Sequence, residues 1–434
     1  PPPPPPPPGL AVEERTPTPY FRDAAPDQAV SVLFSQALDP ASVSDQSVWL
    51  SSASRGRLPA TVDALSDDGR RVTVHSTTPF GAGDNISVHL ASSLKGSTGA
   101  EFAGETFQFW ARSLTPGSER TRQQVFTTLG SVSQLMTGDL NLDGLADIVY
   151  TAENETVVDV LLGRGDGTFQ PALRIDVLQA ILTLELSDLD NDGDLDLLVG
   201  TGDRARVYFS RALEDGLKPD VVRFEAGPEV PTASAVRSLA VGDLDHNGLP
   251  DAVLNTDHGL LIYMDGFNSP PRQVIGDTRQ ARTNIILSDL NLDGHLDLVF
   301  GDRRGSRITY YLSSGAWSVD PPKFLFSEAK HVDLASDAEQ IAVENLTGDG
   351  RPEILALLVG GSAQGKAFRL LVQDSSGSFQ VEGGGEGSGA QAGDPPGDAL
   401  DAGKFAIADL DGNGFPDVTL ASLELGKVFW FPNQ

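Results

Sequence analysis

A nine-residue acidic pattern constrains this chain more than any other feature of its sequence. The pattern reads acid-x-acid-x-acid-Gly-x-x-acid, with Asn or Thr at some acidic positions, and it recurs six times in 434 residues. Repetition at a period of about 50 residues indicates a repeat architecture, because each unit needs its neighbours to bury its apolar face. Successive copies begin 46 to 64 residues apart and are called loops 1 to 6 below: Asp139–Asp147, Asp188–Asp196, Asp243–Asp251, Asp289–Asp297, Asn345–Glu353 and Asp409–Asp417.

Each loop stands in the same sequence setting. An apolar run such as Ile148–Tyr150 or Leu197–Gly200 follows the loop, and a second apolar run such as Val157–Leu162 comes about ten residues later. A turn and a weaker strand, such as Gly165–Gln170, then close the unit. Four short strands in about 50 residues predict a blade of a β-propeller, in which the acidic loop joins the innermost strand to the second.

The two ends of the array determine the expected number of blades. The last repeat stops after three strands, at Lys427–Phe431, and Gln123–Leu129 could supply its fourth strand. Six repeats closed in this way form a ring without an exposed edge strand. A seventh blade would have to lie in the stretch 382–404, whose glycines are typical of a flexible insertion. We therefore predict six blades, with seven as the alternative.

The residue types in the loops suit a hard cation. Oxygens at positions 1, 3, 5 and 9 converge on one centre, and Gly at position 6 permits a turn where a Cβ would clash. The EF-hand loop uses a related spacing, but its last acid is at position 12 and a helix follows it. Flexible loops with only oxygen ligands favour Ca²⁺ over Mg²⁺. Solvated acidic turns are the alternative for any one loop, but six copies in register argue against that reading.

We therefore predict about five structural calcium sites and no catalytic residues. Loop 5 keeps only two acids among Asn345, Thr347, Asp349 and Glu353, so we expect it to be weak or empty. The predicted ligands are Asp139, Asn141, Asp143, Asp147, Asp188, Asp190, Asp192, Asp196, Asp243, Asp245, Asn247, Asp251, Asp289, Asn291, Asp293, Asp297, Asp409, Asp411, Asn413 and Asp417.

The first 113 residues follow a different pattern. Residues 1–16 begin with eight prolines, which favour an extended polyproline II rod, and they are predicted to form a tail. Residues 17–113 alternate apolar and polar side chains in short runs, such as Ala29–Phe34 and Asn85–Leu90, which predicts a β-sandwich. The propeller is predicted to occupy residues 114–434, so the whole chain is expected to be all-β.

Both parts resemble known families. The segments Val30–Val43, Pro79–Asp84 and Phe107–Ala111 resemble bacterial Ig-like domains, which implies a β-sandwich used as a spacer or stalk. The Asp-Leu-Asp-x-Asp-Gly-x-x-Asp core and the ending Leu161–Phe169 resemble the FG-GAP or VCBS repeats of integrin α-subunit propellers and bacterial exported proteins. The second resemblance implies loops that bind Ca²⁺ structurally, while ligands bind through other loops.

Composition excludes several classes of function. Lys and Arg number 31 against 61 Asp and Glu, and a net charge of −30 argues against binding to nucleic acid. The chain has no Cys, which excludes a disulfide framework and a thiolate metal site. No apolar run is long enough to predict a membrane-spanning segment. The six His residues are scattered along the sequence, and no nucleophile elbow or phosphate-binding loop occurs.

These observations predict a non-enzymatic binding or adhesion module of a bacterial type. Calcium sites of about 10⁻⁴ to 10⁻³ M affinity are typical of extracellular modules, which predicts an exported protein that is secreted, periplasmic or on the cell surface. The expected partner is a protein or glycan of the cell surface or matrix. One alternative is a carbohydrate-binding lectin, with Trp317, Phe267 and Tyr263 as candidate sugar-stacking aromatics. The other is a polysaccharide lyase or hydrolase, because acid pairs are abundant.

Overall fold

The chain is all-β in the computed structural model, as predicted. Apart from one short 3-10 turn, η1 (Pro40–Ser42), its regular elements are strands that pair antiparallel. The structure describes residues 9–81, 83–112, 132–164, 168–171, 173–211, 222–265, 271, 273–275, 281–302, 306–314, 318–319, 322–323, 326, 328–347, 349–358, 367–374, 376–381, 402–408, 417–422 and 427–431.

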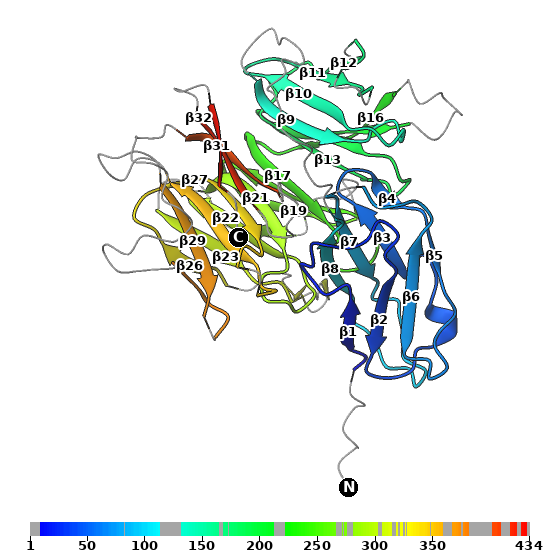
Figure 1. Cartoon of the computed structure of the whole chain (residues 1–434). Helices are drawn as coiled ribbons and strands as arrows, with labels where there is room; N and C mark the ends of the chain where they lie inside the picture. The colour runs from blue at the N-terminus through cyan, green and yellow to red at the C-terminus, as the bar shows by residue number, and fades with distance from the viewer. Residues whose placement is uncertain are drawn as a thin grey trace.

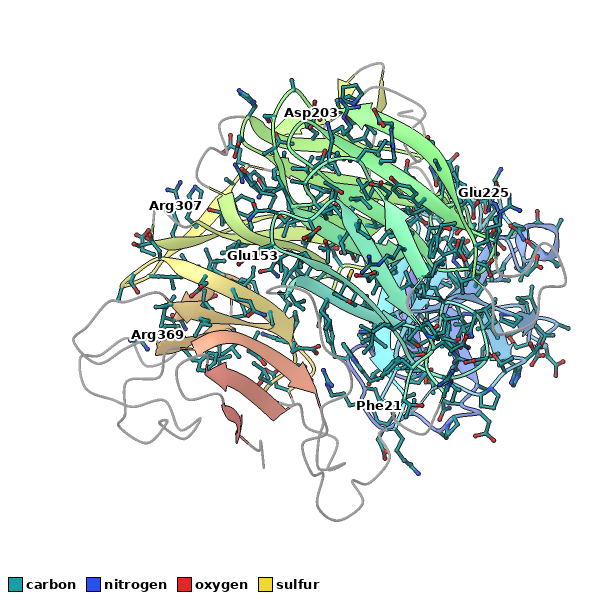
Figure 2. The ribbon with its side chains drawn as sticks, turned by 90° about the horizontal axis from the view of Figure 1, so that it is seen from above. Phe21, Glu153, Asp203, Glu225, Arg307 and Arg369 are labelled. Carbon is teal, nitrogen blue, oxygen red and sulfur yellow. The ribbon has the colours of Figure 1, made fainter. Side chains whose placement is uncertain are left out.

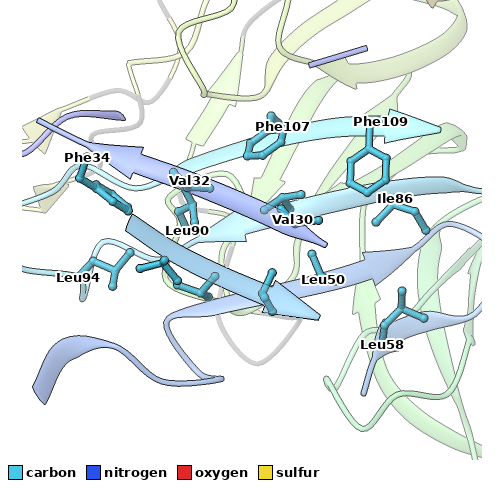
Figure 3. Packing of buried hydrophobic residues seen from close by; sticks show 14 of the residues in the cluster. Val30, Val32, Phe34, Leu50, Leu58, Ile86, Leu90, Leu94, Phe107 and Phe109 are labelled. Carbon is cyan, nitrogen blue, oxygen red and sulfur yellow. The ribbon is translucent and has the colours of Figure 1, made fainter. Parts of the chain in front are cut away.

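The N-terminal strands form a sandwich of two four-stranded sheets, coloured blue to cyan in Figure 1. Side chains that alternate along each strand supply its core, and Val30, Phe34, Leu50, Ile86 and Phe109 are fully buried there (Figure 3). One sheet has the order β1 (Val12–Thr16), β2 (Val30–Phe34), β6 (Arg71–Ser76), β5 (Ala60–Val62), and the other β4 (Gly56–Leu58), β3 (Val48–Ser52), β7 (Asn85–Leu90), β8 (Glu105–Trp110).

The predicted tail is shorter than residues 1–16. Residues 12–16 form β1, which pairs with β2 along its length, and Leu10 packs into the core of the sandwich. The prediction was wrong for residues 12–16, because this segment is a strand at the edge of the first sheet of the sandwich. The pairing of β1 with β2 gives these backbone groups hydrogen-bond partners within a sheet.

Five four-stranded sheets follow the sandwich, each with its strands in chain order except for one inserted hairpin. The first sheet consists of β9 (Val132–Gly138), β10 (Asp147–Ala152), β11 (Val157–Leu161) and β12 (Leu173–Asp176), and the second of β13 (Thr183–Ser187), β14 (Asp196–Gly200), β15 (Arg204–Ser210) and β16 (Phe224–Pro231). The third consists of β17 (Val236–Gly242), β18 (Asp251–Thr256), β19 (Gly259–Tyr263) and β20 (Gln273–Ile275), and the fourth of β21 (Ala281–Ser288), β22 (Asp297–Asp302), β23 (Arg307–Tyr311) and β26 (Lys330–Asp333). The fifth consists of β27 (Ala338–Glu344), β28 (Glu353–Leu358), β29 (Ala367–Gln373) and β30 (Phe379–Val381).

The last sheet has three strands, β31 (Ala402–Ala408), β32 (Asp417–Ser422) and β33 (Lys427–Phe431). The hairpin β24 (Ser318–Val319) and β25 (Pro322–Lys323), which the sequence did not predict, lies between β23 and β26. The outer strand of the first repeat is β12, not the predicted Gly165–Gln170, because Leu173–Asp176 pairs with β11. The segment Gln123–Leu129 and residues 382–401 lie outside the described residues.

The sheets of the array are stacked in chain order. The first strands β9, β13, β17, β21, β27 and β31 lie beside one another successively, so each is the inner strand of its sheet. Seen from above, the sheets fan out from green to red (Figure 2). Apolar side chains fill the space between neighbouring sheets. Val149 and Val160 of one sheet, for example, share a cluster with Leu184 and Leu197 of the next.

All six loops close their hairpins in one register. The residue before position 1 pairs with position 9 in every copy, as in Gly138 with Asp147 and Ser187 with Asp196. Position 9 is therefore the first residue of the second strand. The small residue before a loop also has a packing role. A Cβ on Gly138 would lie 2.6 Å from Cδ1 of Leu195 in the next repeat.

Candidate metal centre

The backbone of the loops takes a strained shape that glycine makes possible. Position 6 is Gly144, Gly193, Gly248 and Gly294 in loops 1 to 4, with φ between 83° and 96°. Position 4 also lies in the left-handed region, although its residues are Leu142, Asn191, His246 and Leu292, with φ between 55° and 61°. A non-glycine residue in this region costs energy and persists only where its surroundings hold it there. The loop side chains provide that hold.

The carboxylate at position 9 braces each of these loops from inside. Its Oδ2 accepts a hydrogen bond from the amide of position 2, and its Oδ1 accepts one from the last residue of the third strand or the turn after it. For Asp196 these donors are Leu189 at 2.8 Å and Ser210 at 2.7 Å. The same pair of bonds occurs at Asp147, Asp251 and Asp297, with distances between 2.7 and 2.9 Å.

The carboxylate at position 1 caps the turn. In loop 1, Asp139 accepts from the amides of Asp143 at 3.0 Å and Gly144 at 2.9 Å. Asp243 and Asp289 accept from the same two positions of their own loops. Position 5 then accepts from the amide of position 7 in all four loops. The acids thus shape the loop through charge-assisted hydrogen bonds.

In two loops the carboxylate oxygens also converge on one point. Within the part of the chain that the structure describes, the sets Asp188, Asp190, Asp196 and Asp243, Asp245, Asp251 each offer three oxygens within 4.8 Å of one another. These are positions 1, 3 and 9 of the predicted ligands, and position 5 is in neither set. One oxygen, Oδ1 of Asp188, is buried without a hydrogen-bond partner in a residue that is 9% exposed. A buried carboxylate oxygen without a donor fits a cation ligand.

Burial raises the pKa of the acids at positions 1 and 9 of both sets. The pKa of Asp188 is raised to about 6 and that of Asp196 to about 8, first because burial disfavours the charged form and further because Asp190 lies beside both. The pKa of Asp243 is raised to about 7 and that of Asp251 to about 8 for the same reasons. A divalent ion at the centre of each set would lower these pKa values, because its charge favours the ionised carboxylates.

The fourth acid of loop 2 is directed elsewhere. Nη1 of Arg211, which follows β15, lies 3.1 Å from Asp190 and 3.2 Å from Asp192. Asp192 is not in the converging set, whereas Asp190 belongs to both groups. The sequence prediction treated loop 2 as the richest site and missed this guanidinium. The sequence signal for this contact is the position of Arg211 directly after Ser210, the last residue of β15, whose amide donates to Asp196.

Loops 1 and 4 are arranged differently, because position 3 is an amide. Asn141 donates to Asp143 at 2.9 Å, and Asn291 donates to Asp293 at 2.8 Å. The acids of these loops are not among the sets of three whose oxygens converge within the described chain. Burial nevertheless raises the pKa of Asp289 to about 7 and of Asp297 to about 8. Loop 6, with Asp409, Asp411 and Asn413, lies outside the described residues, as does the side chain of Asp417.

Loop 5 satisfies its own acid. Oε2 of Glu353 accepts from the amides of Leu346 at 2.7 Å and Thr347 at 2.9 Å, while Oε1 accepts from the Thr347 hydroxyl at 3.1 Å. Asp349 accepts from the amide of Arg351 at 2.9 Å. These contacts agree with the expectation of a weak or empty loop, which stays a prediction.

The sandwich packs against the same loops, which the sequence did not suggest. A spacer or stalk would make few contacts with the array. Instead, the Arg57 amide donates to Asp188 at 3.2 Å, and the Thr106 amide donates to the Gly294 carbonyl at 2.8 Å. The prediction that the sandwich is a spacer or stalk is therefore wrong, because the sandwich packs against the loops of the array. Contacts between segments this far apart in the chain leave no periodic signal in the sequence.

Three of the scattered histidines also meet at this boundary. His246 of loop 3 lies 2.8 Å from His295 of loop 4, between Nε2 and Nδ1. The Thr106 hydroxyl links His246, at 3.2 Å, to His89 of the sandwich, at 3.4 Å. Burial lowers the pKa of His246 and of His89 to about 3, so both rings are neutral. They form part of the contact between the two regions.

One candidate for sugar stacking is in the core. Tyr263 is only 1% exposed, so its ring cannot meet a ligand at the surface, and that candidate was wrong. Trp317 and Phe267 lie outside the described residues. Among the residues that can be assessed, no helix has the length and apolarity needed to cross a membrane.

Comparison with known families fits both regions. A model described as an FG-GAP-like repeat matches residues 139–199, 188–254 and 289–356, and a model described as a bacterial Ig-like domain matches residues 7–111. The chain carries FG-GAP-like repeats after a bacterial Ig-like domain. The repeat matches begin at Asp139, Asp188 and Asp289, the first residues of loops 1, 2 and 4.

Two solved structures are similar to parts of this FG-GAP and Ig-like chain. CopC from Methylosinus trichosporium OB3b matches at 13% identity and TM-score 0.19, covering 26% of this chain and 99% of that one. The N-terminal part of the bacterial S-layer protein SbsC matches at 15% identity and TM-score 0.20, covering 52% of this chain and 44% of that one. No curated protein matches the chain.

Proposed function

We propose that the N-terminal sandwich, with β1 included, is an Ig-like domain and that residues 114–434 form a six-bladed, calcium-stabilised propeller, together making an exported, non-enzymatic binding or adhesion module. The observation that carries the proposal is the set Asp188, Asp190 and Asp196, in which Asp188 and Asp196 are buried and one oxygen of Asp188 has no hydrogen-bond partner. Its three carboxylates, and those of Asp243, Asp245 and Asp251, form oxygen-only donor sets of the kind that Ca²⁺ takes.

The arrangement of the sheets supports the ring. Five four-stranded sheets and one three-stranded sheet follow one another with their first strands adjacent. A final sheet with three strands among the described residues fits a ring closed by an N-terminal strand. Closure would remove the exposed edges of the first and last sheets, which are otherwise sites of aggregation.

The binding role is supported by the families found. FG-GAP-like repeats and Ig-like domains fit an extracellular β-rich module, and neither is an enzymatic family. In this reading the carboxylates of the loops shape the hairpins and hold the ion. They shape backbone rather than contact a substrate, because their oxygens accept from amides of their own repeat.

Calcium binding tests the proposal directly. Isothermal titration of the metal-free chain should show at least two sites, with dissociation constants of about 10⁻⁴ to 10⁻³ M. Titration with Mg²⁺ at the same concentrations is the matched control and should give weaker heats, because Mg²⁺ demands a small octahedral site. A chain that binds no calcium at millimolar concentration would contradict the proposal.

A ligand screen separates the binding role from its alternatives. The calcium-loaded chain is applied to a glycan array and to extracted cell-surface proteins, and polysaccharides are incubated with it in parallel. Retention of a protein or glycan without turnover supports a binding module, and retention confined to glycans identifies a lectin. Polysaccharide cleavage that is lost on substitution of a single acid would replace the proposal with an enzyme.

A further inference from the structure

The Ig-like domain covers the loop ends of the repeats. It contacts loops 1 to 4 through backbone groups, and its Arg22 pairs with Glu344 before loop 5. Ser54 accepts from the amide of Asp139 at 2.7 Å, and the Tyr20 hydroxyl donates to the Asp289 carbonyl at 3.1 Å. The amide of Ser92 donates to the His246 carbonyl at 2.9 Å, in addition to the Arg57 and Thr106 contacts described above. The interface therefore follows the backbone of loops 1, 3 and 4 and the carboxylate at position 1 of loop 2.

Glycines at the boundary allow this close approach. A Cβ on Gly104 of the domain would lie 2.1 Å from Cβ of His246, and a Cβ on Gly294 would lie 2.2 Å from Cγ of Glu105. A Cβ on Gly56 would lie 3.0 Å from Cβ of Asp188. Each contact joins the domain to a different loop. Any change in loop backbone therefore has to move the domain or break the contact.

Docking also removes water from the acidic loops. Asp139, Asp188, Asp243 and Asp289, at position 1 of loops 1 to 4, are between 5% and 9% exposed. The domain meets them with backbone groups, with aromatic surface such as Trp49, which lies 3.2 Å from where a Cβ on Gly248 would be, and with the charges of Arg55 near Asp139 and Glu105 near Asp289. Without a cation, ionised carboxylates buried under the domain would be better solvated if the domain separated from the loops.

We propose that calcium binding in loops 2 and 3 and docking of the Ig-like domain are coupled, so that the ions hold the domain on the loop face of the repeats. The inference rests on the proposed calcium sites. The ion favours the loop shape that the domain recognises and offsets the charge that docking buries. By reciprocity, the docked domain raises the affinity of the loops for calcium by the same factor. Calcium then sets how the domain is placed relative to the repeats.

Hydrogen exchange on the full chain tests the coupling at named amides. The Thr106 amide donates to Gly294 and the Asp139 amide to Ser54, so both report docking. The Phe34 amide, which donates to Arg70 inside the sandwich at 2.9 Å, reports the fold of the domain alone. Removing calcium should speed exchange at Thr106 and Asp139 on the order of tenfold, while Phe34 stays protected.

A pair of glycine variants tests the reverse direction. Gly104→Ala places its Cβ into His246, whereas Gly99→Ala has nothing within 4 Å, and both residues have positive φ, at 89° and 83°. The two variants therefore strain the backbone to a similar extent, and only Gly104→Ala adds a steric clash with His246. Gly104→Ala should weaken calcium binding several-fold and increase the radius of gyration in X-ray scattering, and Gly99→Ala should leave both as in the unsubstituted chain.

The outcomes separate this inference from the proposed function. Calcium that binds by calorimetry but leaves exchange at Thr106 and Asp139 unchanged would overturn the coupling and leave the calcium sites standing. Failure to bind calcium at all would overturn both. Equal calcium affinity of the Gly104→Ala and Gly99→Ala variants, with the domain released in the first, would also overturn the coupling. Loss of Phe34 protection in Gly104→Ala would mark a misfolded domain, and the exchange result on the unsubstituted chain would then decide.

Discussion

Loops 2 and 5 share one hairpin register but satisfy their acids in opposite ways. In both, the residue before position 1 pairs with position 9. Loop 2 brings Asp188, Asp190 and Asp196 together and leaves an oxygen of Asp188 buried without a donor. In loop 5, Glu353 accepts from the amide of position 2 as Asp196 does, but it also accepts from the amide and the hydroxyl of Thr347. The same backbone turn can thus be held by an ion or by the chain alone.

The difference lies in the residues at positions 1 and 3. Asp188 and Asp190 add charge that the fold does not neutralise fully, even with Arg211 beside Asp190. Asn345 and Thr347 are neutral, and Thr347 supplies a donor where loop 2 has a carboxylate. Buried like charge is stable only with a counter-ion, so loop 2 depends on its surroundings in a way that loop 5 does not.

Removal of calcium should give the largest effect. At about 100 times its dissociation constant, each occupied site stabilises the fold by about 2.7 kcal/mol. For two sites in a chain of this size, chelation should lower the melting temperature by on the order of 10 °C. Differential scanning calorimetry with calcium and with a chelator measures the shift. Equal melting temperatures would remove the distinction between loops 2 and 5.

The substitution Asp188→Asn should have effects that depend on calcium. Oδ2 of Asp188 accepts from the amides of Arg57 and Gly193, and an Asn carbonyl can keep both bonds. The Asn amide then replaces the oxygen that has no partner. Without calcium the variant should be as stable as the unsubstituted chain or more stable, because a buried charge is gone. With calcium it should lose about 2 kcal/mol of the stabilisation from that site, which thermal melts under both conditions will show.

The pH dependence should change sign with calcium. Burial raises the folded pKa of Asp196 and of Asp251 from 3.8 to about 8. Between about pH 4 and pH 8 the folded state therefore binds more protons than the unfolded state, and the stability of the metal-free chain should fall as pH rises. Calcium requires the anions, so its stabilising effect should grow over the same range. Melts at pH 5 and pH 8, with and without calcium, would show the two trends diverge; parallel trends would contradict the account.

The matching change in loop 5 should have the smallest effect on calcium stabilisation. Glu353→Gln replaces one acceptor oxygen with a donor and should destabilise the hairpin by about 1 kcal/mol, since Glu353 accepts from Leu346 and Thr347. The loss should be the same with and without calcium. A loss confined to the calcium-loaded chain would show that loop 5 binds the ion after all.

Local sequence patterns predicted the strands well. Alternation in Asn85–Leu90 and the apolar runs after each loop became β7 and the second strands of the sheets, because burial on a sheet repeats every two residues. The convergence of Asp188 with Asp196 was also predictable, since both lie in one nine-residue loop. These features depend on neighbours close in the chain.

Contacts across the chain were not predictable in the same way. Nothing in the sequence near Arg57 or Thr106 indicates that their amides meet loops 2 and 4. The pairing of Arg211 with Asp192 depends on where β15 ends relative to the loop. Such contacts come from the packing of separate elements, which has no fixed spacing in the sequence. The misplaced stalk has this cause, whereas the counter-ion Arg211 had a local signal in its position directly after β15.

A crystal structure of the full chain grown with calcium tests the central claim most directly. The account predicts anomalous density between Asp188, Asp190 and Asp196, with metal–oxygen distances of about 2.3–2.6 Å, and a second ion between Asp243, Asp245 and Asp251. Loop 5 should contain no ion. Water alone between the carboxylates of loops 2 and 3, in crystals saturated with calcium, would contradict it.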